Sequence, residues 1–258
     1  MGVLNVTPDS FSDGGQLLSS EGLRHDRLLE RAAQMRAHGA AILDIGGEST
    51  RPGAAPVSLQ EELDRVMGAV QLIASRLDVI LSIDTSTPEI MREAAQAGAG
   101  LLNDVRAFSR EGAMAAAVAS KLPVSLMHMS DEPDRMQKRT EYADVVTDVK
   151  AFLAHRIAAC QEAGIANDQM MIDPGFGFGK TVAQNYEMLR RLEEFASFDL
   201  PILVGVSRKS MIGAVTGRPA SDRAVPSAVL AVMAAARGAS VIRVHDVAET
   251  ADALAVWQ

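Results

Sequence analysis

Short apolar runs recur eight times along this 258-residue chain, and their number and spacing constrain the fold more than any other feature. Each run is short and mainly apolar, as expected of a buried parallel strand. The runs cover residues 3–6, 41–45, 79–83, 100–102, 124–127, 170–172, 202–206 and 240–244.

Amphipathic stretches separate these runs and read as helices, at residues 22–38, 59–76, 88–97, 142–162, 183–195 and 223–237. Glycines of the kind that end helices follow at Gly39, Gly98, Gly164 and Gly238. Alternation of strand and helix predicts an α/β fold with a parallel sheet, either a closed barrel or an open doubly wound sheet. Eight units in a chain close to the roughly 250 residues typical of the (β/α)8 TIM barrel favour the barrel. With no linker of biased composition, we expect a single domain over residues 1–258.

The overall charge excludes some classes of partner. A net charge of −8 argues against a general binder of nucleic acid or of anionic membranes, so an anionic ligand needs a local basic pocket. No apolar run reaches the roughly 18 residues that span a bilayer, and no basic-then-apolar leader is visible, so we expect a cytoplasmic protein. One cysteine, Cys160, excludes a disulfide framework and reads as a buried structural thiol.

Polar side chains follow every predicted strand, and in a barrel these strand ends meet at one rim, where active sites of this fold are built. A single such residue, Asp44 for example, is better explained as a helix N-cap or as a loop group satisfied by the backbone. Their occurrence at all eight ends favours a site. They are Asn5, Asp44, Asp84, Asn103, His128, Asp173, Ser207 with Arg208 and Lys209, and Arg243 with His245.

Three glycine-rich segments adjoin these strand ends. The loops from Thr7 to Gly15 and from Gly46 to Gly53 read as binding loops or lids, the alternative being surface loops without function. The stretch MIDPGFGFGKT fails both nucleotide-binding fingerprints, because Pro174 and Lys180 stand where glycine is required. It predicts instead a permissive turn after Asp173 that can present Phe176 and Phe178 next to the site.

Basic residues cluster on the last two strand ends, in SRKS and RVHD, at the corner where this fold commonly binds phosphate. The five histidines show no zinc-ligand spacing, and no nucleophile motif is present. A Mg²⁺ ion held by oxygen atoms and substrate phosphates remains open, because such a site needs only one or two protein ligands.

Eight segments, in order, resemble the motifs of the dihydropteroate synthase family: MGVLNVTPDSFSDGG, LDIGGESTRPGA, SIDTS, NDVRAF, LMHM, IDPGFGFGK, VGVSRKSMIG and IRVHDV. The resemblance runs from Met1 to about Asp246 and includes the barrel. It implies that 6-hydroxymethyl-7,8-dihydropterin pyrophosphate is joined to p-aminobenzoate, giving dihydropteroate for folate and pyrophosphate, after dissociative loss of the leaving group. It also implies inhibition by sulfonamides.

The same resemblance assigns residues to roles. Pterin binding falls to Asp84, Asn103, Asp173, Lys209 and Phe178, and pyrophosphate binding to Asn5, Thr50, Arg51, Arg243 and His245. The p-aminobenzoate pocket is expected from Phe11, Pro52, Phe178, Ser207 and Ser210, completed by Asp13. Catalysis is assigned to Lys209, Asp84, Asp13 and Arg243, and a Mg²⁺ ligand to Asn5.

The stretch from Ala224 to Ala236 is apolar on nearly every helical face, which predicts a homodimer interface, as in the family, rather than close packing on the barrel. Pro226-Ser227 replaces the glycine-serine that the family has here.

The rival activity is that of a methyltetrahydrofolate-dependent methyltransferase, another pterin-binding barrel, which needs no pyrophosphate corner. A binding module without activity would have lost rim residues.

Overall fold

The structure, a computed structural model, describes residues 1–7, 18–19, 22–48, 57–133 and 135–258. Its main sheet has eight parallel strands in chain order. They are β1 (Gly2–Asn5), β4 (Ile42–Gly46), β5 (Ile80–Asp84), β6 (Leu101–Asp104), β7 (Val124–Met127), β8 (Met170–Asp173), β9 (Ile202–Val204) and β10 (Ala239–Ile242).

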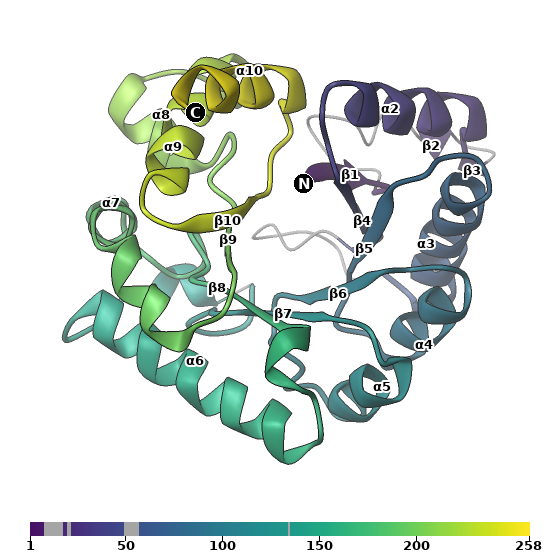
Figure 1. Ribbon diagram of the computed structural model, residues 1–258, viewed down its shortest axis with the longest axis horizontal. Helices are drawn as coiled ribbons and strands as arrows, with labels where there is room; N and C mark the ends of the chain where they lie inside the picture. The colour runs from purple at the N-terminus through teal and green to yellow at the C-terminus, as the bar shows by residue number, and fades with distance from the viewer. Residues whose placement is uncertain (8–17, 20–21, 49–56, 134) are drawn as a thin grey trace.

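The sheet closes on itself between its first and last strands. The amide of Val3 donates to the carbonyl of Val244, and the amide of Val244 donates to the carbonyl of Met1, both over 2.9 Å. Figure 1 shows the resulting ring of strands with helices around its outside. The predicted single-domain barrel is confirmed, and the strand ends differ from expectation by at most two residues.

Helices follow the strands as α2 (His25–Ala37), α3 (Leu59–Ala74), α4 (Pro88–Gln96), α5 (Ala113–Ser120), α6 (Val145–Glu162), α7 (Val182–Arg190), α8 (Ser210–Thr216), α9 (Ala224–Ala235) and α10 (Val247–Trp257). Local sequence sets several starts. Ser58 and Glu61 form a capping box before α3, Thr181 and Gln184 form one before α7, and Pro88 opens α4. Short 3-10 helices lie at Met136–Lys138, Asn167–Gln169, Leu192–Phe198 and Ala220–Asp222.

Two predicted helices are wrong in extent. The stretch 22–38 begins with β3 (Gly22–Leu23), which pairs with β2 (Leu18–Ser19) in a hairpin, and the helix starts only at His25. The stretch 183–195 is α-helical only to Arg190 and continues as a 3-10 helix. Leu192 and Phe195 are both fully buried there, and a three-residue repeat brings such a pair onto one face.

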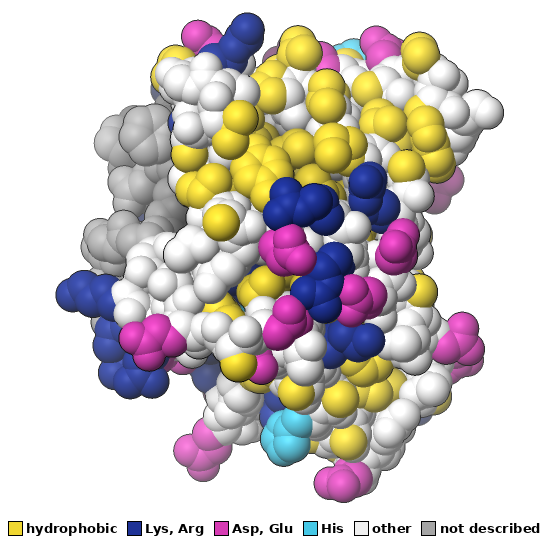
Figure 2. Space-filling view, turned by 90° about the vertical axis from the view of Figure 1, so that its left-hand side faces the viewer, with side chains coloured by type: hydrophobic (Ala, Val, Ile, Leu, Met, Phe, Trp, Pro, Cys, Tyr) yellow, Lys and Arg dark blue, Asp and Glu magenta, His cyan; other side chains and the backbone are white. Residues whose placement is uncertain are grey.

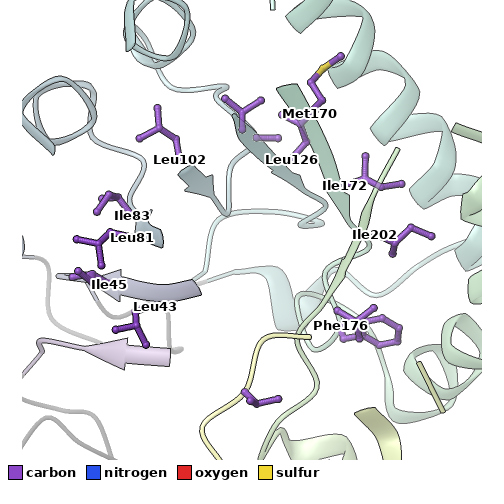
Figure 3. Packing of buried hydrophobic residues seen from close by; sticks show 14 of the residues in the cluster. Leu43, Ile45, Leu81, Ile83, Leu102, Leu126, Met170, Ile172, Phe176 and Ile202 are labelled. Carbon is purple, nitrogen blue, oxygen red and sulfur yellow. The ribbon is translucent and has the colours of Figure 1, made fainter. Parts of the chain in front are cut away.

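The main apolar core lies between the strands and the helices outside them. Leu43 and Ile45 on β4 and Leu81 and Ile83 on β5 are buried and point to the same side of the sheet, because side chains alternate along a strand. Figure 3 shows this layer. The opposite side chains, Asp44 and Ser82 among them, therefore face the inside of the barrel.

No helix among the described residues is long and apolar enough to cross a membrane.

Candidate active site

One row of residues crosses four neighbouring strands at the carboxyl end of the barrel. Asn5 is paired in register with Gly46, Gly46 with Asp84, and Asp84 with Asn103. Gly46 puts no side chain between Asn5 and Asp84. A Cβ at this position would lie 3.4 Å from Oδ1 of Asn5 and 3.6 Å from Cβ of Asp84, so a larger side chain would fill the space beside both residues. Strand register thus gathers three of the predicted site residues onto one rim.

Arg243 joins this row from the far end of the chain. Its Nη2 donates to Oδ2 of Asp84 over 2.8 Å, and its Nε donates to Oδ2 of Asp44 over 2.6 Å. Both acceptors are carboxylates in a setting largely shielded from water, where charge-assisted hydrogen bonds are strong. The sequence assigned Arg243 to pyrophosphate; in the structure its guanidinium is held between two carboxylates, one of them a predicted pterin ligand.

Asp44 lies inside the barrel and caps no helix. It is the third residue of β4, is fully buried, and accepts a hydrogen bond from Ser82 Oγ over 2.5 Å. The Asn103 amide lies 3.4 Å from both of its oxygens. Reading Asp44 as a helix N-cap is therefore wrong, because its carboxylate faces inward and anchors Arg243.

Asp173 and Lys209 form the opposite part of the rim. Asp173 ends β8, and its Oδ1 accepts from the amide of Gly175 over 2.7 Å. Lys209 Nζ donates to the carbonyl of Phe176 and lies 4.6 Å from the ring centre of Phe178. The predicted permissive turn is confirmed, since Gly175, Gly177 and Gly179 all have positive φ. Of the two aromatic residues expected beside the site, Phe178 lies next to Lys209, whereas Phe176 is fully buried in the apolar core.

The ionisable groups of the rim have shifted pKa values. Burial raises the pKa of Asp84 to about 7, although Arg243 opposes the shift. Burial also raises the pKa of Asp173, with Lys209 opposing, and it lowers the pKa of Lys209 to about 8, with Asp173 opposing. Carboxylates and a lysine whose pKa values are shifted toward neutrality at one end of a barrel are typical of a functional site.

The last two strand ends carry the other predicted basic groups. The Nδ1 of His245 lies 3.1 Å from Oγ of Ser207, and Arg208 forms a bidentate ion pair with Asp246. Ser227, which follows the proline that replaces the family's glycine, accepts from the Arg208 amide over 2.9 Å. Ser227 thus contacts the loop that carries Lys209 despite the proline before it.

Several predicted residues fall outside the part of the chain that the structure describes, namely Phe11, Asp13, Thr50, Arg51 and Pro52. The two loops read as lids lie largely there too. Of the predicted p-aminobenzoate pocket, Ser207 is buried and Ser210 is exposed at the start of α8. Their roles, like those of the other assigned residues, stay predictions.

The sequence did not predict three residues that support the rim, namely Ser82, Lys180 and Asn185. Ser82 donates a hydrogen bond to Asp44. Lys180 is buried and contacts His128, and Asn185 accepts from the amide of Gly177 over 2.7 Å. The sequence signal for Lys180 is its place directly after a glycine-rich turn, where a buried lysine can donate to the carbonyls of the turn.

Known proteins match this arrangement closely. Residues 1–245 match the family model described as pterin binding enzyme. Dihydropteroate synthase of Escherichia coli K12 is 51% identical over 257 residues, covering 99% of this chain and 89% of that protein.

Solved structures agree. The Yersinia pestis dihydropteroate synthase in a sulfonamide drug complex has a TM-score of 0.96 at 50% identity, covering 100% of this chain and 92% of that one. The Xanthomonas albilineans enzyme in complex with 7,8-dihydropteroate has a TM-score of 0.88 at 42% identity, covering 100% and 91%. Fold and rim together define a pterin-binding (β/α)8 enzyme. The chain belongs to the dihydropteroate synthase family.

Proposed function

We propose that this transferase of folate synthesis makes dihydropteroate by a dissociative route, in which pyrophosphate leaves the pterin methylene before the arylamine attacks. The carbon–oxygen bond breaks with its electron pair going to pyrophosphate, and the nitrogen of p-aminobenzoate then bonds to the carbon and loses a proton. The observation that carries the proposal is the meeting of Asp84, Arg243, Lys209 and Asp173 at one rim of the barrel, since this route needs hydrogen bonds and charge but no nucleophilic side chain.

Asp173 is the main pterin contact in this proposal. One of its oxygens is taken by the Gly175 amide, and the other can accept from the pterin ring N–H and amino group. Asp84 and Asn103 read the remaining edge, and Lys209 donates to the ring oxygen and nitrogen. The cation of Lys209 beside the Phe178 ring fixes one wall of the pocket.

Pyrophosphate is bound in our proposal by Arg243 and His245, together with Thr50 and Arg51. The charge of Arg243 is compensated by Asp44 and Asp84 until the substrate brings its own negative charge. Competition between these carboxylates and pyrophosphate for one guanidinium favours binding of the leaving group in its most charged state.

The residues at hand fit a Mg²⁺ ion beside Asn5. The amide oxygen of Asn5 lies beside Gly46, which has no side chain to cover it. Among the described residues, no group of three His, Cys, Asp or Glu side chains could hold a metal ion without substrate. Mg²⁺ commonly takes one or two protein oxygens and completes its shell with water and substrate phosphate. When bound, the ion supplies positive charge to the pyrophosphate oxygens, which Asn5 helps to orient.

The arylamine pocket is proposed to use Phe178, Ser207 and Ser210 with Phe11, Asp13 and Pro52. Sulfonamides, as mimics of the arylamine, then compete with p-aminobenzoate, and a noncompetitive pattern would contradict the pocket as assigned.

Pyrophosphate release with dihydropterin pyrophosphate and Mg²⁺, measured with and without p-aminobenzoate, tests the function. Release matched by dihydropteroate formation is expected. Pterin binding with no release would favour the methyltransferase reading, and absence of binding by pyrophosphate alone with Mg²⁺ would strengthen that alternative.

We further propose a homodimer through α9, with small molecules as the other partners. Val225 and Val229 on α9 are 67% and 55% exposed, and Val215 on α8 is 66% exposed. Figure 2 shows hydrophobic side chains gathered over the part of this face where α8 and α9 lie. Light scattering at micromolar concentration should give twice the chain mass, falling to one chain in Val225→Asp/Val229→Asp but not in Val118→Asp on α5. A wild-type mass of one chain would contradict the dimer.

The proposed location is the cytoplasm, which suits the buried, unpaired thiol of Cys160.

A further inference from the structure

Residues 174–179 form the turn that follows Asp173, and we call them the glycine turn. Side chains from other parts of the chain donate hydrogen bonds to most of its backbone carbonyls. Five of its six carbonyls, those from Gly175 to Gly179, each accept a hydrogen bond from a side chain. The donors are Lys180 to Gly175 and Phe178, Lys209 to Phe176, Gln137 to Gly177, and Tyr142 to Gly179.

Lys180 differs from the other donors in burial and in reach. Lys180 is only 4% exposed, and its Nζ donates to the carbonyls of Gly175 and Phe178 over 2.8 and 3.1 Å. The Gln137 bond, by contrast, is exposed, so water can replace it at little loss. Of these hydrogen bonds to the glycine turn, only the one from Lys180 to Gly175 is fully buried, so removing Lys180 leaves that acceptor unsatisfied away from solvent.

The third contact of Lys180 fixes the glycine turn to the neighbouring strand. Its Nζ lies 2.9 Å from Nδ1 of His128, directly after β7. Burial and the charge on Lys180 lower the pKa of His128 to about 2, so the imidazole is neutral. An ammonium donates to all three partners, and a neutral amine donates to the two carbonyls and accepts from an Nδ1–H tautomer; both protonation states keep the geometry.

The two carbonyls that Lys180 binds belong to residues that contact or form the proposed pterin pocket. Gly175, whose carbonyl binds Lys180, gives its amide to Oδ1 of Asp173. Phe178, whose carbonyl also binds Lys180, places its ring beside the Lys209 ammonium. A shift of the glycine turn would therefore move both Asp173 and Phe178.

We propose that Lys180, held by His128, is a positioning residue for pterin recognition: it sets the glycine turn and through it the Asp173 carboxylate and the Phe178 ring, without touching substrate. The inference rests on the proposed function, because it takes Asp173 and Phe178 as pterin contacts. It predicts a loss confined to the pterin side of the site, because Arg243 and His245 are held by other elements.

The test compares two ligands on the full chain, 6-hydroxymethyl-7,8-dihydropterin and inorganic pyrophosphate with Mg²⁺, by calorimetric titration. In Lys180→Met the pterin Kd should rise at least tenfold, while the pyrophosphate Kd stays within twofold. Val70→Ala, a fully buried change on α3 across the barrel, is the control for lost stability and should alter neither Kd. A pterin Kd within twofold of wild type in Lys180→Met, or equal weakening of both ligands, overturns the inference.

A milder pair of variants keeps the test decisive if Lys180→Met does not fold. His128→Leu removes the third partner of Lys180 and should weaken pterin binding several-fold, whereas His128→Asn offers an amide there and should restore it. Equal pterin affinity in the wild type and both variants overturns the inference. Failure of the wild type itself to bind dihydropterin contradicts the proposed function instead, so the two failures are distinguishable.

Discussion

Arg243 and Asp84 lie 2.8 Å apart in the mouth of the barrel although 159 residues separate them in the chain. With Asp44 on the other side of the guanidinium, one cation balances two carboxylates. This triad couples the stability of the closed barrel to the chemistry proposed for its rim, since Arg243 comes from the last strand end and both acids come from strands near the first.

Replacing Arg243 by Met should destabilise the fold as well as weaken pyrophosphate binding. Removing one partner of a buried ion pair commonly costs about 3 to 5 kcal/mol, and we expect the lower end, since the Arg243 side chain is 22% exposed. Urea unfolding measures the loss. Arg190→Met, which removes an exposed pair with Glu187, should lose less than about 1 kcal/mol. Adding Asp44→Asn and Asp84→Asn to Arg243→Met should recover most of the stability; no recovery would show that the loss comes from packing.

Pterin affinity should depend on pH through Asp84. Burial raises its pKa to about 7, so the carboxylate is ionised above that pH and protonated below it. A protonated carboxyl loses acceptor capacity toward the pterin N–H groups, so affinity is full above pH 7 and falls as pH decreases, approaching about tenfold per pH unit. Titration of dihydropterin from pH 5.5 to 8.5 measures the slope. Asp84→Asn should flatten it, and Asp168→Asn, at an exposed position, should not; an unchanged slope in Asp84→Asn assigns the proton elsewhere.

Local patterns were sufficient to predict the barrel and most of the rim. Apolar runs define the strands, and parallel strands bring residues such as Asn5, Asp84 and Asn103 to one edge once their register is set. These inferences need only short-range periodicity and the geometry of the fold.

The contacts between rim residues could not be predicted in the same way. Arg243 meets Asp44 across 199 residues, and that contact depends on how far the strands are staggered when the barrel closes. Lys180 is visible in the sequence beside the glycines, but whether its side chain turns inward depends on the hydrogen-bond partner that His128 supplies from the end of another strand. Composition and spacing carry no signal for either.

Asp173→Asn should abolish tight pterin binding while leaving the fold nearly intact. The asparagine oxygen can still accept from the Gly175 amide, which now lies 2.7 Å from Asp173 Oδ1, but its NH₂ group faces the pterin donors. Each mispaired buried group costs about 1 to 3 kcal/mol, which corresponds to about 5- to 150-fold in Kd. Fluorescence titration with dihydropterin gives the Kd, and thermal melting checks the fold. Unchanged affinity would remove Asp173 as the central pterin contact.

Gly175→Ala should be far more damaging than Gly164→Ala, although both glycines have positive φ, +71° and +98°. A Cβ on Gly164 meets nothing within 4 Å, so that variant bears only backbone strain of about 1 to 2 kcal/mol. A Cβ on Gly175 would overlap the carbonyl oxygen of His128 and lie 3.4 Å from Lys180 Nζ, so the glycine turn must shift. Urea unfolding should show the larger loss for Gly175→Ala, and dihydropterin titration should show weakened binding in that variant alone. Equal losses of stability in the two variants would mean that the backbone at His128 yields without displacing the glycine turn.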